Sequence, residues 1–378
     1  ISLIRTVENA LVEVSGMLQR MRVLAVQSAN DTNTATERAF ANNELNQLQL
    51  EISRVSLNTR YNGAQVLDGS FSGKSLQVGT ESGESISFSI ANIESSELGA
   101  FIEEGLAKGA ILGDIPPPNG TSVSDLTIAG KKSQVIDVEL NDTAQEVAKK
   151  INAVAGGTQV TAEARTFAHL YTSAAAPEGD QINRRISFSD SAGNATATAA
   201  FTLTSNDVSD AVQKINAIST TTGVQASATS DYKVLLTKQN GDDIRVTNTS
   251  PSELNDAIKI RTVGINGVSE VGDEVALAKA GAADDAATVR GNIRLTSNYD
   301  FTVTDHASAP NFFTAGAKAA KLTNISSVDV LTRITSTDAL AVIDGAIATV
   351  SSYRGGLGTL ENRLDYTVSN LMKVTEYT

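Results

Sequence analysis

The sequence contains no cysteine and no tryptophan, and only two of its 378 residues are histidine. Without cysteine, the chain can form neither disulfide bonds nor thiolate metal sites. A Ser-His-Asp triad has few ways to form when His169 and His306 are the only imidazoles. The zinc motif His-Glu-x-x-His, the nucleophile elbow Gly-x-Ser-x-Gly and the phosphate-binding glycine loop are also missing. We therefore predict no catalytic residues, no cofactor and no metal, and both histidines at the surface or at a strand edge.

Positive charge is scarce relative to negative charge, since 30 basic and 43 acidic residues give a formal net charge of -13. Proteins approach a phosphate backbone with clusters of Lys and Arg, so we expect no nucleic-acid partner. Acidic pairs are present, but none has the spacing of a calcium-binding EF-hand, and such pairs are more typical of solvated turns. These pairs are Glu103-Glu104, Asp242-Asp243 and Asp284-Asp285.

Long apolar runs are also missing. No run approaches the roughly 20 residues needed to span a bilayer, and the first residues lack the regions of a signal peptide. We therefore expect no membrane insertion and no cleavable leader.

The two ends of the chain carry apolar residues at alternating steps of four and three, which is typical of coiled-coil helices. A second run, over residues 45–55, follows a polar break at residues 30–34, and a third covers residues 340–371 with Asp338 expected as its N-cap. An isolated helix cannot bury such a stripe, so we expect the C-terminal helix to pack against the N-terminal pair. The first run comprises Ile4, Val7, Leu11, Val14, Leu18, Met21, Ala25 and Ser28.

Alternation of polar and apolar residues replaces this pattern in the middle of the chain. Residues 75–90 predict a β-hairpin with Gly79 and Gly83 at its turn, and residues 116–120, with three prolines, predict a turn or linker near a domain boundary. A third strand-rich stretch covers residues 292–303 before the helical pattern returns near Leu322.

An internal repeat follows the prolines, because residues 147–153 recur as residues 211–217 and the strand residues after them recur at the same offset. Each copy predicts a strand (126–128 or 201–203), a short helix that ends at Ile-Asn, and another strand. The sequence therefore predicts an α+β fold. A long coiled-coil-like helical rod with a β-hairpin carries a strand-rich α/β insertion with two repeat units, at about 121–165 and 198–246.

Several of these segments resemble bacterial flagellin. Residues 1–30, with the strings Asn58-Thr59-Arg60-Tyr61-Asn62-Gly63 and Val66-Leu67-Asp68-Gly69, are similar to the N-terminal core of that family. Residues 339–371 resemble its C-terminal core, including Leu357, Gly358, Asn362, Arg363 and Leu364. The two repeats resemble the Ile-Asn motif of flagellin and hook-protein insertions, for which no functional residues are defined.

The resemblance implies a structural subunit of an extracellular flagellar filament that supports motility. Its expected partners are further copies of itself in a helical homopolymer and the flagellar export and capping proteins. Residues 1–100 and 322–378 would form the helical core and residues 101–321 the variable outer region. Because the chain begins within a heptad without a methionine and stops without a helix-ending signal, we expect a fragment that is monomeric in dilute solution.

The resemblance also implies a receptor site, because Arg20, Leu24 and Glu44 match flagellin positions implicated in recognition by Toll-like receptor 5. The sequence departs from the usual pattern at Val23, where glutamate is common, and this departure would weaken binding. An arginine suits an interface because its guanidinium makes several hydrogen bonds. The alternative is that these residues face a neighbouring subunit in the filament.

A surface-binding protein that displays its insertion to an extracellular glycan is the other function considered. Tyr171, Tyr232 and the many Ser, Thr and Asn residues are compatible with sugar contacts, whereas the absence of tryptophan counts against stacking. An anionic polymer would need a basic patch such as Lys131-Lys132 or Arg184-Arg185.

Overall fold

The computed structural model describes residues 2–77, 85–172, 183–251 and 258–376. The chain divides into two compact units. Unit 1 contains Ile1–Phe101 and Lys321–Thr378, and unit 2 contains Ile102–Ala320. The chain passes from the first unit into the second within strand β5 (Gly99–Glu104).

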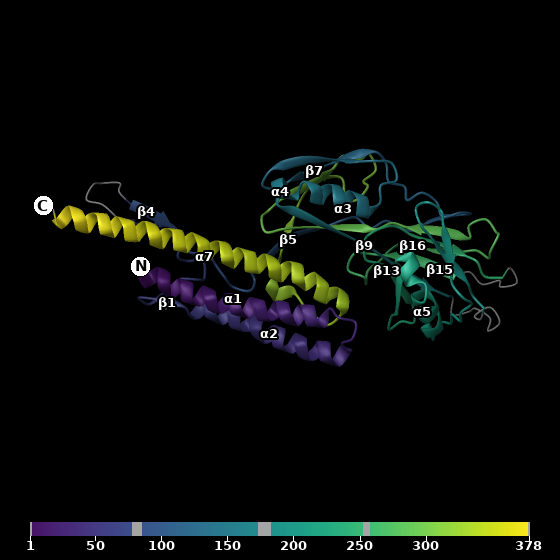
Figure 1. Cartoon of the computed structure of the whole chain (residues 1–378), viewed down its shortest axis with the longest axis horizontal. Coiled ribbons are helices and arrows are strands. Elements are labelled where there is room, and N and C mark those ends of the chain that lie inside the picture. The colour runs from purple at the N-terminus through teal and green to yellow at the C-terminus, as the bar shows by residue number, and fades with distance from the viewer. Residues whose placement is uncertain (1, 78–84, 173–182, 252–257, 377–378) are drawn as a thin grey trace. The chain divides into compact units, whose positions relative to one another are not determined.

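Three helices dominate unit 1: α1 (Ser2–Ser28), α2 (Ala35–Asn58) and α7 (Arg333–Glu376). Helix α1 packs against both α2 and α7, and Figure 1 shows the three lying side by side, with α7 extending beyond the start of α1. The buried stripe of α1 contains every member of the first predicted apolar run. The buried apolar residues of α7 are Ala339, Val342, Ile343, Ala346, Val350, Leu357, Leu360 and Leu364.

Side-chain caps explain where two of these helices begin. Thr34 caps α2, because its Oγ1 accepts a hydrogen bond from the Glu37 N–H at 3.2 Å while Glu37 Oε2 accepts one from the Thr34 N–H at 2.7 Å. Helix α7 begins at Arg333, where Thr332 Oγ1 accepts from the Thr335 N–H at 3.1 Å. The prediction of Asp338 as N-cap was therefore wrong: Thr332 caps the helix six residues earlier, and Asp338 lies inside it.

Short strands complete unit 1. Strands β1 (Arg60–Tyr61) and β2 (Ala64–Gln65) form a hairpin whose turn residues, Asn62 and Gly63, both have positive φ. Strand β3 (Lys74–Gln77) pairs with β4 (Ser85–Phe88) as the predicted hairpin, although Gly79 and Gly83 lie outside the described residues. Strand β21 (Lys321–Asn324) and a 3-10 turn, η2 (Ile325–Ser327), lead towards α7.

Helix α7 also contains a stretch, Arg333–Ser369, whose length and mean hydropathy of 1.2 would suit a membrane span, although sequence analysis found no such run. Core helices of soluble proteins pass the same test. Helix α7 packs its apolar stripe against α1, and ion pairs link the two helices, Arg22 to Asp344 and Arg5 to Glu361. These contacts bury part of the apolar surface of α7, 39% of the most apolar window of that stretch.

Unit 2 is built around β9 (Val160–Tyr171), which pairs along its length with β13 (Val234–Lys238), β15 (Ile258–Val263) and β18 (Asn292–Ser297). This sheet is extended by β12 (Gln225–Ala228), β16 (Glu270–Leu277) and β5. A second sheet has the order β11-β10-β14-β17-β6, and a third has the order β20-β19-β7-β8.

The strands of the second sheet are β6 (Ile111–Gly113), β10 (Ile186–Ser189), β11 (Ala195–Ala197), β14 (Ile244–Asn248) and β17 (Ala286–Val289). Those of the third are β7 (Ser124–Ala129), β8 (Ser133–Val138), β19 (Thr302–Asp305) and β20 (Gly316–Ala319). The helices of the unit are α3 (Ala144–Ala153), α4 (Ala155–Thr158), α5 (Ser209–Asn216) and α6 (Ser219–Thr222). One apolar core contains residues of β9, β10, β13, β14, β15 and α5.

The two segments that share the Ile-Asn sequence make the same contacts. Ile151 and Ile215 are fully buried at the ends of α3 and α5, and each is followed by an asparagine that bonds to the backbone of the next strand or its flank. The segments differ at their beginning: Phe201 forms only an isolated bridge with Arg184, so the strand predicted at residues 201–203 is absent. Thr202 instead donates its N–H to Asp210 Oδ2 at the start of α5, at 2.7 Å.

Residues 116–120 were predicted as a linker near a domain boundary, but they lie inside unit 2. Asn119 is almost fully buried there and makes three hydrogen bonds to two other segments of the unit, at residues 141–142 and at Asp243. A buried amide with satisfied hydrogen bonds fixes this loop in place, which proline and glycine content alone would not indicate.

Candidate functional sites

Arg20 and Glu44 lie on neighbouring helices and form a bidentate ion pair. Arg20 Nε donates to Glu44 Oε1 at 2.6 Å, and Arg20 Nη2 donates to Glu44 Oε2 at 3.0 Å. The hydrogen bond from Arg20 lowers the pKa of Glu44 below its ordinary value. Both side chains are about half exposed, so the pair ties α1 to α2 and also remains accessible from outside the unit.

Leu24 does not join them at the surface, because its side chain is only 3% exposed. It follows Met21 by three positions and belongs to the same buried stripe of α1. The structure thus brings two of the three predicted receptor residues together and places the third in the helical core. Two of the exposed residues close to Leu24 on α1, Val23 and Val26, are apolar.

Unit 1 carries further apolar side chains that are exposed to solvent. Phe40 and Leu50 on α2 are 69% and 65% exposed, and Tyr366 and Val368 are exposed on the C-terminal half of α7. Exposed apolar groups mark surfaces that bind other molecules where they form a contiguous patch, whereas single exposed apolar residues are ordinary. A cavity of about 500 Å³ also opens in this unit, and its lining includes Leu11, Leu67, Phe88, Ile90, Tyr353, Leu357, Leu360 and Arg363. Burial raises the pKa of the Tyr353 hydroxyl.

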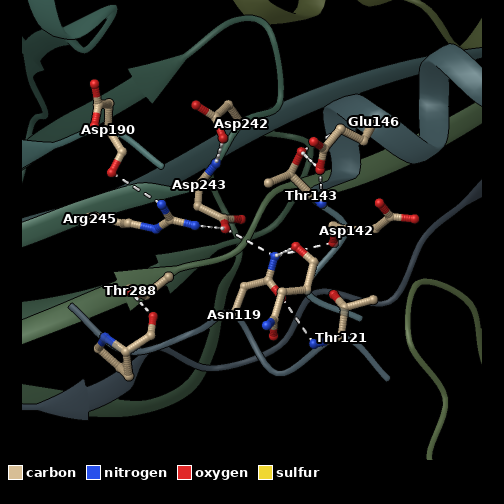
Figure 2. A network of polar contacts seen from close by, with 12 residues as sticks. Asn119, Thr121, Asp142, Thr143, Glu146, Asp190, Asp242, Asp243, Arg245 and Thr288 are labelled. Carbon is tan, nitrogen blue, oxygen red and sulfur yellow. Dashed lines mark hydrogen bonds and ion pairs between the residues drawn. The ribbon is translucent and has the colours of Figure 1, made fainter. Parts of the chain in front are cut away.

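A buried polar network lies in unit 2 where the two Ile-Asn segments meet, and Figure 2 shows it. Asn119 Nδ2 donates to the carbonyl oxygens of Asn141 and Asp142, both at 3.1 Å, and to Asp243 Oδ2 at 3.0 Å. Arg245 Nη2 lies 3.3 Å from the same Asp243 oxygen, and Arg245 Nη1 donates to the Asp190 carbonyl at 3.2 Å. The network therefore connects four parts of the chain that are far apart in sequence.

Asp243 is the most deeply buried acid of this network, since its side chain has 0% exposure. Burial raises the pKa of its carboxyl from 3.8 to about 6, against the effects of Asn119 and Arg245, which lower it. Arg290 is buried within range of this charge, and burial lowers its pKa to about 10. The Arg290 guanidinium lies over the Phe312 ring, 4.9 Å from its centroid. Two opposite charges share one poorly solvated region.

The acidic pairs considered as cation ligands are engaged otherwise. Lys238 Nζ donates to Asp242 Oδ2 at 2.7 Å, and Asp285 Oδ2 accepts from the Gly281 N–H at 2.8 Å. Arg294 Nη2 pairs with Glu104 at 2.8 Å. Within the described residues, no group of three or more His, Asp or Glu side chains is placed to hold a metal ion.

His169 was predicted at the surface or at a strand edge, but it is 6% exposed at the centre of the main sheet. The predicted position of His169 was wrong, because other strands pair with both edges of β9. Its Nδ1 lies 2.8 Å from Glu270 Oε1, and Glu270 also accepts from Lys233 and, at 2.7 Å, from Arg261. The Lys233 hydrogen bond, followed by the one from His169, lowers the pKa of Glu270 to about 2.

The remaining predicted residues are scattered over unit 2. His306 Nε2 lies 2.9 Å from Thr127 Oγ1 on the exposed face of the third sheet. The Tyr171 hydroxyl donates to Glu274 at 2.7 Å, and Tyr232 occupies a turn with positive φ. Arg184 is completely buried, so Arg184-Arg185 does not form a basic surface patch. Lys131 lies over the Tyr299 ring, 5.5 Å from its centroid.

Two family models match parts of the chain. Residues 1–72 match the bacterial flagellin N-terminal helical region, and residues 125–172 match the flagellin hook IN motif. The first match covers α1 and α2, and the second covers β7 to β9 with Ile151 and Asn152.

Individual proteins are similar to larger parts of the chain. B-type flagellin of Pseudomonas aeruginosa is 27% identical over 379 aligned positions, which cover 100% of this chain and 75% of that protein. Flagellin B of Vibrio anguillarum is 35% identical over 162 residues, 41% of this chain and 42% of that protein. A solved structure, FliC from Burkholderia pseudomallei, is 16% identical and aligns over 96% of this chain and 98% of that one with a TM-score of 0.38.

Proposed function

The chain belongs to the bacterial flagellin family, and on that basis we propose that it is a structural subunit that assembles into the flagellar filament outside the cell through unit 1. The observation that carries this proposal is the match of α1 and α2 to the flagellin helical region, on helices that leave large apolar side chains uncovered. Unit 2 would then be the variable outer region of the subunit.

Association of identical subunits through unlike surfaces produces an open helical polymer, whereas a self-complementary surface closes on itself. The exposed groups of unit 1 suit the first kind of contact, because Phe40 and Leu50 lie on α2 whereas Tyr366 and Val368 lie on α7. Each surface would be buried by a different surface of a neighbouring copy. Burial of a Phe or Leu side chain contributes about 1.5–3 kcal/mol, so a few such residues can decide whether a filament grows.

The test begins with filaments sheared from the bacterium that encodes this sequence. Peptides of this chain should be found in the purified filaments by mass spectrometry. Replacement of both Phe40 and Leu50 by serine should shorten the filaments seen by electron microscopy and reduce motility. Asn46→Ser, at an exposed polar position of the same helix, is the matched control and should leave filament length unchanged. Filaments that contain no peptide of this chain would refute the proposal.

The two Ile-Asn segments are proposed to be copies of one structural unit, of which the family model covers only the first. The same asparagine contact in both segments supports this assignment. We also propose that α1, α2 and α7 form a coiled-coil-like core, in support of which their buried residues follow the heptad spacing.

We also propose that Toll-like receptor 5 recognises this protein. The exposed Arg20–Glu44 pair is the part of the site that a receptor could contact directly, while Leu24 would act by fixing the position of α1. Arg20→Ala should reduce receptor activation by the purified protein without altering its circular dichroism spectrum. Arg54→Ala is the control, because Arg54 pairs with Glu51 on the same helix, α2. Equal activation by both variants would argue that the pair serves only subunit packing.

A further inference from the structure

An open pocket of about 390 Å³ lies at one end of the third sheet, and all of its lining residues belong to unit 2. Its lining includes a row of three small side chains on neighbouring strands, because Thr302 of β19 pairs with Ala129 of β7 and with Ala319 of β20. Directly paired residues lie on the same face of a sheet. The other lining residues are Gly130, Lys131, Tyr299, Asp300, Phe301 and Ala320.

Backbone contacts hold the walls of this pocket in place. The Lys131 N–H donates to the Thr158 carbonyl oxygen at 2.9 Å, and a Cβ atom at Gly130 would approach the same oxygen to 2.2 Å. The β7–β8 turn is therefore fixed closely against residue 158. Near the other wall, the Ala320 N–H donates to the Phe301 carbonyl oxygen at 2.9 Å. A pocket that is already formed before binding requires less ordering when a ligand enters.

Three of the lining side chains are accessible to a ligand, since Tyr299 is 47% exposed and both Lys131 and Asp300 are exposed as well. Lys131 Nζ lies over the Tyr299 ring, 5.5 Å from its centroid, which holds the ammonium beside the ring without neutralising its charge. Among the residues that the structure describes, neither Lys131 nor Asp300 has an ion-pair partner. Both charges are therefore available to a bound molecule.

The chemistry of these three side chains suits an acidic sugar. The Tyr299 ring can pack against the apolar C–H face of a sugar, and the Asp300 carboxylate can accept hydrogen bonds from its hydroxyl groups. A carboxylate on the sugar would receive a charge-assisted hydrogen bond from Lys131, to which a neutral sugar offers no opposite charge. The volume corresponds to about 13 water molecules at roughly 30 Å³ each, which is enough for a whole sugar ring.

The net charge of -13 does not oppose this binding strongly. Salt screens interactions between exposed charges beyond about 8 Å at physiological ionic strength, so the groups in and beside the pocket outweigh the distant ones. Lys132 follows Lys131 in the same turn and adds positive charge locally.

We propose that this pocket binds a hexuronic acid residue of an extracellular glycan, with the sugar carboxylate on Lys131, sugar hydroxyl groups on Asp300 and the ring face against Tyr299. The site lies entirely within unit 2, so this binding is separate from the assembly proposed for unit 1. In the proposed filament, the same weak site would recur on every subunit. Many weak contacts together give strong attachment to a surface that carries many copies of the sugar.

The test is saturation-transfer NMR on the whole chain with two matched pairs of probes. One pair is the methyl glycosides of glucuronic acid and glucose, and the other is those of galacturonic acid and galactose. We expect at least one acidic probe to give a saturable signal. Its neutral counterpart should bind at least about fivefold more weakly, because it lacks the carboxylate that pairs with Lys131.

Lys131→Gln should weaken binding of the acidic probe by about tenfold. Lys132→Gln is the matched control, because it removes the same charge from a side chain that lies beside Gly157 and does not line the pocket, so binding should stay within about twofold. Tyr299→Ala should weaken binding by about threefold or more. Tyr232→Ala should leave binding unchanged, since Tyr232 is 52% exposed but lies outside the pocket.

All four positions are exposed, and circular dichroism would show that each variant keeps its fold. Three results would each overturn the proposal. These are no saturable signal with either acidic probe, equal binding of the acidic and neutral members of each pair, or an equal loss with Lys131→Gln and Lys132→Gln. The last result would mean that the turn attracts anions only through its overall positive charge. Filament assembly is measured separately, and none of these results bears on it.

Discussion

Asn216 and Ala226 exchange two hydrogen bonds, since Asn216 Nδ2 donates to the Ala226 carbonyl and the Ala226 N–H donates to Asn216 Oδ1, both at 2.8 Å. Asn152 and Ala162 form the same pair with the same distances. The amide of the asparagine thus acts as a short piece of strand, which fixes the end of a helix against the next strand. An aspartate lacks the donor for this contact and an alanine lacks both groups, which explains why asparagine stands at this place in each segment.

We predict that Asn216→Ala lowers the free energy of unfolding by about 1–3 kcal/mol, because it leaves two backbone groups without partners. Asn216→Asp should lower it by a similar amount at neutral pH, since the new carboxylate would face the Ala226 carbonyl. Urea titrations followed by circular dichroism would measure both. Asn46→Ala, at an exposed site, is the control and should change stability by less than about 0.5 kcal/mol. A wild-type-like midpoint for Asn216→Ala would contradict the prediction.

Gly345 of α7 lies directly against Gly99, the first residue of β5. A Cβ atom at Gly345 would approach the Gly99 carbonyl oxygen to 2.6 Å and the Ala100 Cβ to 2.8 Å. Alanine in place of glycine normally stabilises a helix by about 0.5–1 kcal/mol. Here we predict the opposite sign, with Gly345→Ala lowering stability by about 1–3 kcal/mol because the backbones must separate.

The same helix supplies the matched control for this prediction. Gly355 has no other heavy atom within 4 Å of the place where its Cβ would lie, so Gly355→Ala should raise stability by up to about 1 kcal/mol. Thermal unfolding of the two single variants should therefore move the midpoint in opposite directions. If both substitutions raise the midpoint, the close approach of Gly345 to Gly99 does not occur in solution.

The helical part of the fold could be predicted from the sequence because burial in a helix pair follows a local period. Every member of the first apolar run, from Ile4 to Ser28, lies in the buried stripe of α1. Asp338 was mistaken for the cap because residues 332–338 contain several residue types that can cap a helix. Thr332 is the cap because the helical backbone begins directly after it. Local patterns decide which residues are helical but do not fix where the helix begins, and here the predicted cap lies six residues too late.

The polar network of unit 2 had no local signal of this kind. Asn119 and Asp243 are 124 residues apart, and each lies in a stretch that is typical of exposed turns. His169 and Arg184 were placed at the surface for the same reason, because charged or polar residues are usually exposed. Their burial depends on which strands pair with β9 and on where Phe201 lies, and neither can be read from periodicity. The polar network around Asp243 was therefore not predicted.

Glu270 should stabilise the fold at neutral pH. Its pKa falls from 4.5 to about 2 in the folded chain, so its contribution is fully present above pH 4.5 and is lost as the pH falls towards 2. We predict that Glu270→Gln lowers the free energy of unfolding by about 1–3 kcal/mol at pH 7. The difference between wild type and variant should shrink in acid. Denaturant titrations from pH 7 to pH 2 would show this, and a constant difference would contradict it.

Asp243 should produce a pH dependence of the opposite sign. Its pKa is about 6 in the folded chain and near 3.8 when unfolded, so the folded state binds a proton more readily. The stabilising contribution of the protonated form is fully present below pH 3.8 and is lost as the pH rises through 6. We therefore predict that the stability of the wild type relative to Asp243→Asn falls by about 1–3 kcal/mol between pH 4 and pH 7.

The comparison with Asp243→Asn isolates this one group, because both proteins share every other titratable residue. Denaturant titrations of the two proteins at half-unit steps of pH would give the difference directly. Asp190→Asn serves as a control with the opposite sign, because hydrogen bonds from Asn194 lower the pKa of Asp190. The wild type should therefore gain stability relative to Asp190→Asn as the pH rises through the acid range. If the Asp243 difference also grew in favour of the wild type with rising pH, its carboxyl would be better stabilised as an anion than its burial indicates, and the prediction would be contradicted.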